Sequence, residues 1–226
     1  MKHLNKVKRP LLVEVPNHPK LTNEQFLSAY SKGMKIIDTR NKLDFAAGYV
    51  PNSLNIQGNN SFSTWAGWLL NYEEQFMLIA DEDQMEDLTR KLMRIGLDNV
   101  YGYISDVNAL EIKLEKAEVI SRETFKSFMN NDNVQIVDVR GVTEYEAGHV
   151  PGADNVFVGT LEDNLEKVRR DKQVIVHCQA GDRSAVAYSV LARNGYTRVK
   201  NYMGGMSEWV TNNESVNSKP SASVGA

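Results

Sequence analysis

Residues 174–184 read Val-Ile-Val-His-Cys-Gln-Ala-Gly-Asp-Arg-Ser. The first four residues, which are mostly apolar, predict a short buried strand. A tight loop follows, opened by Cys178 and marked by Gly181. The next residues, 183–194, predict a helix that Gly195 ends. A cysteine at the end of a strand, followed by a loop that curls onto a helix N-terminus, is typical of an anion-binding cradle.

The chemistry expected of this cradle centres on Cys178. Backbone N–H groups of the loop and of the first helical turn point inward, and the helix dipole adds partial positive charge. Both effects favour the nucleophilic thiolate over the thiol. Arg183 adds a fixed cation suited to an oxyanion. A lone cysteine is more often a buried structural residue, but the accompanying glycine, arginine and helix favour a nucleophile here.

Further motifs surround the loop along the second half of the chain. In order, they are Asp138-Val139-Arg140, Glu144-Tyr145, Gly-His-Val-Pro-Gly-Ala at 148–153, and Gly204-Gly205-Met206 with Trp209. Together with Cys178-x-x-Gly181-x-Arg183-Ser184, this ordered set resembles the rhodanese-type sulfurtransferases. The resemblance implies that Cys178 is the catalytic nucleophile and carries a persulfide intermediate.

The resemblance also implies roles for the rest of the loop. Its substrate-binding residues would be Gln179, Ala180, Gly181, Asp182, Arg183 and Ser184, whose backbone N–H groups would stabilise an anionic sulfur. Gly181 would let the backbone curl tightly. Arg183 would bind a sulfonate or orient the loop. Ser184 would cap the helix and hydrogen-bond the loop.

The chain repeats itself at an offset of 100 residues. Residues 36–56 and 136–156 share eight identities in 21 positions, among them Asp38 with Asp138 and Arg40 with Arg140. Strands alternate with helices in both halves. The expected helices are 23–31, 63–70, 84–95, 121–129 and 183–194, and the expected strands are 34–37, 54–56, 75–80, 100–104, 134–137 and 174–177. This pattern predicts an α/β fold of two tandem rhodanese-like domains, each a mainly parallel sheet flanked by helices.

The two copies are expected to differ in activity. We expect a leader or linker at 1–20, a degenerate domain at 21–115, a catalytic domain at 116–211 and a disordered tail at 212–226. In the first copy the loop position falls at about residues 79–85, which contain no cysteine and carry Asp81, Glu82 and Asp83. Such a degenerate-then-active pair is similar to the C-terminal part of bacterial fusions with a persulfide dioxygenase. A dioxygenase domain or protein is therefore an expected partner.

Composition excludes several classes of function. The 226 residues carry a net charge of −3, which gives no reason to expect nucleic-acid binding or an anionic membrane partner. No apolar run approaches the roughly 20 residues of a membrane span. The single cysteine excludes an internal disulfide and indicates a reducing, cytoplasmic setting. The four histidines show no metal-ligand spacing, so we expect no metal and no cofactor.

Two alternatives to a sulfurtransferase stay open. Phosphatases and arsenate reductases of related fold place five residues between cysteine and arginine, whereas four intervene here, which suits a sulfur atom better than phosphate. A non-catalytic persulfide carrier or sulfide-sensing scaffold is the other alternative. For the enzyme, the expected donor is thiosulfate or a low-molecular-weight persulfide, and the expected acceptor is a thiol, sulfite or cyanide.

Four further groups receive structural interpretations. His177 precedes Cys178 on a strand, so its side chain should point to the opposite face and pack in the core. Asp138 and Arg140, present in both copies, predict a structural ion pair. Trp65 and Trp68, three residues apart on a helix, predict core packing. A pocket role for His149, and for Met206 and Trp209 as pocket walls, stays open.

Overall fold

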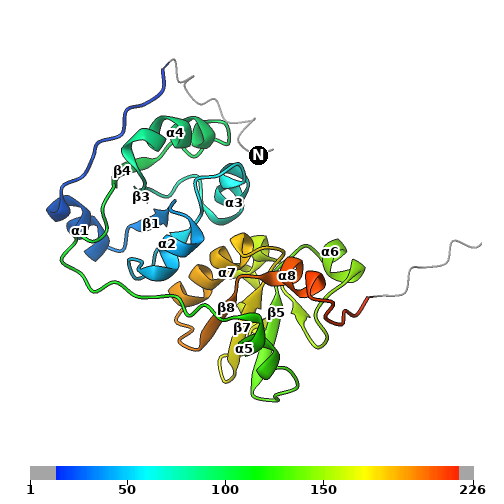
Figure 1. The fold of residues 1–226 in the computed structure, drawn as a ribbon. Helices are drawn as coiled ribbons and strands as arrows, with labels where there is room; N and C mark the ends of the chain where they lie inside the picture. The colour runs from blue at the N-terminus through cyan, green and yellow to red at the C-terminus, as the bar shows by residue number, and fades with distance from the viewer. Residues whose placement is uncertain (1–13, 219–226) are drawn as a thin grey trace, which may run out of the picture. The chain divides into compact units, whose positions relative to one another are not determined.

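The chain divides into two units, Met1–Lys116 and Ala117–Ala226 (Figure 1). The structure, a computed structural model, describes residues 14–218. Each unit contains a parallel sheet of four strands with helices packed against it, and each is described by itself below.

The first unit has the sheet order β2-β1-β3-β4. Its strands are β1 (Lys35–Asp38), β2 (Leu54–Asn55), β3 (Phe76–Ile79) and β4 (Val100–Ile104). Its helices are α1 (Asn23–Ser31), α2 (Lys42–Ala47), α3 (Phe62–Leu69) and α4 (Met85–Met93), with a 3₁₀ turn, η2 (Glu82–Gln84), before α4. All strand pairs are parallel.

The second unit repeats this topology as β6-β5-β7-β8. Its strands are β5 (Val134–Asp138), β6 (Asp154–Asn155), β7 (Gln173–His177) and β8 (Val199–Tyr202). Its helices are α5 (Arg122–Ser127), α6 (Val142–Ala147), α7 (Asp182–Arg193) and α8 (Gly205–Thr211), with 3₁₀ segments η3 (Val158–Thr160) and η4 (Glu162–Lys167). The predicted α/β class with two duplicated parallel sheets is confirmed.

Local sequence signals explain where several helices begin and end. The Thr22 side chain accepts the N–H of Gln25, whose side chain accepts the N–H of Thr22, and this capping box begins α1. Ser121 caps α5 through the N–H of Thr124. Gly195 follows α7 with φ +77°, a left-handed conformation that glycine adopts at little cost.

An aromatic cluster forms one face of the second unit's core. Phe125 of α5 stacks on Tyr202 at 4.4 Å between ring centroids and meets Trp209 of α8 edge-on at 5.5 Å. Ile136 and Ile175 pack into the same cluster from the two central strands. Trp209 is 1% exposed, so truncating it to alanine would cost about 3–5 kcal/mol. Of the two roles left open for Trp209, pocket wall and core packing, the structure supports core packing.

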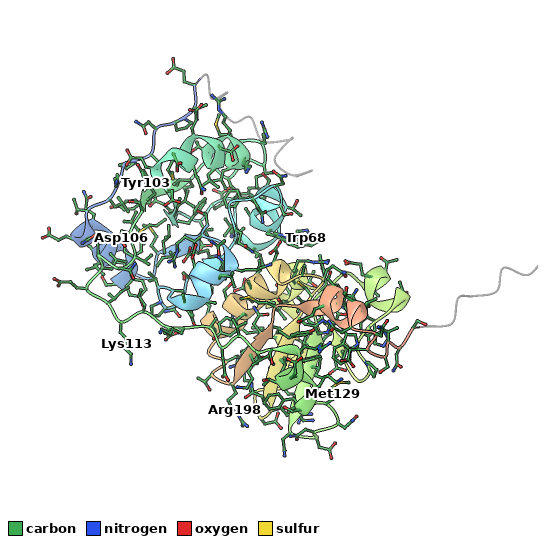
Figure 2. All side chains as sticks on the ribbon, in the orientation of Figure 1. Trp68, Tyr103, Asp106, Lys113, Met129 and Arg198 are labelled. Atoms are coloured by element: carbon green, nitrogen blue, oxygen red, sulfur yellow. The ribbon has the colours of Figure 1, made fainter. Side chains whose placement is uncertain are left out.

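The prediction of a tryptophan pair in the core is wrong for Trp68. The buried stripe of α3 is Phe62, Ala66 and Leu69, which covers one face of the helix at four- and three-residue spacing. Trp65 lies beside this stripe and is partly buried, whereas Trp68 lies outside it and is 52% exposed. Figure 2 labels Trp68 on this helix. A spacing of three residues puts both tryptophans on the same side of the helix, but it does not determine which side of the helix is buried.

The segments outside the two sheets differ from the expected linker and tail. Residues 1–13 and 219–226 of those segments lie outside the described residues. Lys20 pairs with Tyr103 in an isolated parallel bridge beside β4, so the end of the expected linker is held by backbone hydrogen bonds. Asn217 pairs with His149, and the Trp209 indole N–H donates to the carbonyl of Ser215 at 2.8 Å. The expected disorder therefore does not hold for residues 212–218, because these contacts tie them to the second unit.

The topology places one loop at a position suited to binding. Strand β7 lies at the centre of its sheet, between β5 and β8, and its carboxyl end leads into residues 178–181. Ligands of open α/β sheets bind outside the carboxyl ends of strands. Among the helices of residues 14–218, none is long and apolar enough to cross a bilayer.

Candidate active site

Cys178 lies directly after β7, four residues before the first residue of α7. It is 1% exposed, and its Sγ accepts the backbone N–H of Gly181 at 3.1 Å. Gln179, Ala180 and Asp182 are exposed around it. The loop thus curls back on its own cysteine, and one inward N–H group is directed at the sulfur, as the sequence predicts for an anion cradle.

Gly181 has a conformation that makes this curl possible. Its φ of 93° and ψ of −19° lie in the left-handed region, where a side chain costs about 1–2 kcal/mol. Gly181 is also the N-cap of α7, without a side-chain cap. Ser184 therefore does not cap the helix as predicted. Its hydroxyl donates to the Gly181 carbonyl at 3.1 Å and so holds the loop against the first turn.

The N-terminus of α8 supports the loop from another side. The N–H groups of Met206 and Ser207 donate to the carbonyls of Cys178 and Gln179, both at 2.9 Å. Gly205 has φ +58°, and a Cβ there would overlap the Cys178 carbonyl oxygen and lie 2.7 Å from that of Gln179. Gly204-Gly205 was singled out in the sequence only as part of the motif set, and neither this contact nor β8 and α8 was predicted. Met206 acts here through its backbone.

Arg183 projects from the first turn of α7 to Glu144 of α6. Its Nη1 donates to Oε2 at 2.5 Å and its Nη2 to Oε1 at 2.8 Å, a bidentate pair. These hydrogen bonds hold the pKa of Glu144 below its usual value, and the carboxylate raises the pKa of Arg183. Both groups are therefore charged at neutral pH. Of the two roles expected for Arg183, this geometry supports orientation of the loop.

Asp138 and Arg140 form the structural ion pair that was predicted. Arg140 donates to both carboxylate oxygens of Asp138, with Nη2 at 2.7 Å from Oδ2, and to the Gly148 carbonyl at 2.7 Å. The side chains are 5% and 0% exposed. Arg140 also reaches Gln179 Oε1 at 3.4 Å. The pair therefore connects the end of β5 with the loop.

The two histidines of this unit direct their Nδ1 atoms at backbone carbonyl oxygens, those of Cys178 and Tyr145. His177 is fully buried, as predicted, and burial lowers its pKa even though Asp138 Oδ2 lies 4.0 Å from its Nε2. It is therefore neutral at physiological pH. His149 stacks on Tyr145 at 3.8 Å between centroids, and its Nδ1 lies 2.8 Å from the Tyr145 carbonyl oxygen.

The corresponding position in the first unit follows from strand register. Asp38 pairs with Ile79, as Asp138 pairs with His177. Ala80 therefore takes the position of Cys178, and the equivalent segment begins at Ala80 rather than at Ile79, a correction of one residue. A polar cavity of about 270 Å³ lies there, lined by Thr39, Arg40, Asn41, Asp44, Gln57, Gly58, Asn59, Asp81 and Gln84.

Metal-ligating side chains do not gather in the part of the chain that the structure describes. Among residues 14–218, no group of three or more histidine, cysteine, aspartate or glutamate side chains is placed to hold a metal ion. The chemistry available at the loop is that of a buried sulfur, the inward N–H group of Gly181 and a helix N-terminus, which together suit a nucleophile that becomes an anionic adduct.

Comparison with known proteins identifies relatives of both halves. The family model of the rhodanese-like domain matches residues 22–111 and 121–212. The chain is 28% identical over 185 residues to YrkF of Bacillus subtilis (strain 168), named a candidate sulfur carrier protein. That alignment covers 80% of this chain and 91% of YrkF.

Two sulfurtransferases match shorter stretches. A thiosulfate sulfurtransferase of Pseudomonas aeruginosa is 32% identical over 123 residues, which cover 44% of this chain and 45% of that protein. The solved structure of the human single-domain sulfurtransferase TSTD1 is 29% identical, covers 42% of this chain and 97% of its own, and has a TM-score of 0.40.

Proposed function

The chain belongs to the rhodanese-like domain family over both of its halves, and from this premise we propose that it is a sulfurtransferase acting through Cys178. Sulfur transfer in general is supported by the family and by the names of its relatives. The observation that carries the finer proposal is the Cys178 Sγ, which accepts the Gly181 N–H at the N-terminus of α7.

In the first half-reaction, the Cys178 thiolate attacks the outer sulfur of thiosulfate or of a low-molecular-weight persulfide. A bond forms between Sγ and that sulfur, and the donor's sulfur–sulfur bond breaks. Sulfite or a thiolate leaves with the electron pair, and Cys178 carries a persulfide. The loop N–H groups and the dipole of α7 stabilise this anionic adduct.

In the second half-reaction, an external nucleophile removes the sulfur. Cys178 is the single cysteine of the 226 residues, so no other thiol of this chain can take it. A small thiol, sulfite, cyanide in vitro or a partner protein would be the acceptor. A persulfide dioxygenase, the partner implied by the sequence resemblance, would use a persulfide formed in such a reaction or compete for the same donor.

A persulfide carrier is the second candidate, favoured by the name of YrkF. Such a carrier would be loaded with sulfur on Cys178 but would release it only to a dedicated partner protein. The same loop geometry serves both functions, because the protection of an anionic persulfide is common to them. The two candidates differ in whether small acceptors sustain turnover.

Steady-state kinetics with thiosulfate and cyanide test the proposal. We expect continuous thiocyanate formation and parallel double-reciprocal lines, the pattern of a ping-pong mechanism. Mass spectrometry after donor alone should show one added sulfur atom, on Cys178. Stoichiometric loading without turnover with cyanide, sulfite or small thiols would instead support the carrier, and absence of loading by any donor would contradict both.

A further inference from the structure

The bidentate pair between Glu144 and Arg183 lies at the first turn of α7, the helix that directly follows the Cys178 loop. Glu144 takes two of the five N–H donors of the guanidinium, at 2.5 and 2.8 Å. Its Oε2 also accepts the Gly141 N–H at 3.2 Å, which fixes the carboxylate at the start of α6. The positive charge of Arg183, which the sequence analysis expected to bind an oxyanion, is therefore already neutralised by the fixed carboxylate of Glu144.

The charged side chains around the loop do not favour binding of a sulfur donor that carries two negative charges. In the described part of the chain, both arginines that reach the loop are paired bidentately, Arg140 with Asp138 and Arg183 with Glu144. Because Cys178 is only 1% exposed, a donor must bring its charge close to a desolvated site, where uncompensated charge is costly.

The first unit shows that this pair is dispensable for the fold. The segment that follows β3 in the first unit, residues 80–89, contains no arginine to match Arg183, and the duplication places Asp44 at the position of Glu144. Asp44 instead accepts a hydrogen bond from Asn41. Helices α2 and α6 nevertheless have the same length of six residues. The glutamate and the arginine are lost together with the cysteine, which associates the pair with the chemistry of the loop.

We propose that Glu144 is a positioning residue that sets the charge preference for the sulfur donor, so that Cys178 accepts sulfur from persulfides and other donors of low charge in preference to dianionic thiosulfate. This inference rests on the proposed function. With a persulfide RSSH, the thiolate of Cys178 bonds to the outer sulfur, the RS–SH bond breaks, and its electron pair leaves on RS⁻. Cys178 then carries –SSH, and no external oxidant is needed.

The test compares two donors that differ by one unit of charge. Thiosulfate carries two negative charges, and methanethiosulfonate, CH₃SO₂S⁻, carries one on the same sulfur–sulfur framework; its leaving group is methanesulfinate. The measured quantity is the ratio of kcat/KM for thiosulfate to kcat/KM for methanethiosulfonate. The variants are Glu144→Gln and, as a matched control two residues along the same helix, Glu146→Gln.

Glu144→Gln should raise this ratio about fivefold, the effect of one unit of charge near a partly solvated site, and Glu146→Gln should change it less than twofold. An equal change for both donors in Glu144→Gln would overturn the inference and leave the proposed function intact. Absence of turnover and of loading with both donors in the wild type would overturn the proposed function as well.

The wild-type protein provides a second measurement that does not depend on the folding of a variant. If the site repels a dianion, raising the ionic strength should raise the ratio, because salt screens the larger charge more strongly. A ratio that falls with salt would show net attraction of the dianion and would overturn the inference.

A conservative variant adds a third comparison. Glu144→Asp keeps the negative charge and should therefore retain the wild-type ratio of the two kcat/KM values.

Discussion

The two units share an anchor at the first strand of each sheet and differ in the loop beside it. In both, a fully buried aspartate binds an arginine two residues on, and the arginine Nη2 reaches a glycine carbonyl, at 2.8 Å in the first unit and 2.7 Å in the second. In both, an asparagine seventeen residues after the aspartate donates to the carbonyls of that aspartate and arginine. We name Asp38, Arg40 and Asn55, and Asp138, Arg140 and Asn155, the anchor.

The loops beside the two anchors have different chemistry. After β7, the chain places a cysteine, a glycine of positive φ and a helix N-terminus around one sulfur. After β3, it places Ala80, then Asp81 and a 3₁₀ turn, and α4 begins only at Met85. Three carboxylates, Asp81, Glu82 and Asp83, replace the anion cradle.

This difference separates residues that maintain the fold from residues of the proposed active site. The anchor is also present in the copy that lacks the loop cysteine. Its ion pair therefore has a structural role, which is to stabilise the ends of the β-strands. The cysteine, the loop glycine and the Glu144–Arg183 pair occur in one copy and are absent together from the other. Sequence duplication within one chain thus acts as an internal control for assigning function.

The largest expected effect is that of Cys178→Ser. A hydroxyl is a far weaker nucleophile than a thiolate at neutral pH, so sulfur transfer should fall below detection while the fold is retained. Thiocyanate formation and circular dichroism check the two halves of this expectation. The matched variant adds Ala80→Cys to Cys178→Ser, and recovery of turnover there would contradict the claim that a cysteine needs the surrounding loop.

Gly205→Ala should have the next largest effect. The added Cβ overlaps the Cys178 carbonyl oxygen at a residue with φ +58°, which should cost about 2–3 kcal/mol in unfolding free energy. Displacement of the loop by about 1 Å should slow persulfide formation about 100-fold. Urea denaturation and single-turnover loading measure these effects. Gly148→Ala, where a Cβ meets nothing within 4 Å, is the control and should change both quantities little.

Gly181→Ala should have a smaller effect that is specific to the persulfide intermediate. Its φ of 93° makes a side chain strained, at about 1–2 kcal/mol, and relief of that strain would turn the Gly181 N–H away from Sγ. The persulfide should then be lost severalfold faster once donor is removed in the absence of acceptor. Mass spectrometry over time measures this rate, and equal lifetimes in variant and wild type would contradict stabilisation by the loop.

The smallest expected effect comes from the loop of the first unit. Replacing Asp81, Glu82 and Asp83 together by alanine should leave KM for thiosulfate, measured in steady state, within about twofold and should change the urea unfolding midpoint little. The Lys20–Glu82 ion pair lost in this variant is 53% and 68% exposed, so solvent already screens it. A large rise in KM would show that the first unit contributes to donor binding.

Much of the fold could be predicted because its signals are local. The apolar run at 174–177, the capping box at Thr22 and the glycine after α7 each predict an element from neighbouring residues, and each matches the structure. Strand β8 and helix α8 were not predicted. The sequence 199–202, Val-Lys-Asn-Tyr, is half polar, and its place in the sheet depends on pairing with β7.

The candidate site likewise contains residues that could be predicted from the sequence and a contact that could not. Cys178, Gly181 and the arginine of the loop could be selected from their spacing, and the anchor from its occurrence in both copies. Glu144 was selected as part of the motif Glu144-Tyr145, but its partner was not, because the bond to Arg183 joins residues 39 positions apart.

By itself, the sequence determined the duplicated α/β architecture and singled out the loop that carries Cys178, because periodicity, capping and tight-turn chemistry act over a few residues. Tertiary structure alone decided that Arg183 is held by Glu144, that α8 supports the loop backbone, and that Trp68 faces outward. Those outcomes depend on which helix faces and strand ends meet when the sheet assembles, and such distant contacts leave no pattern in neighbouring residues.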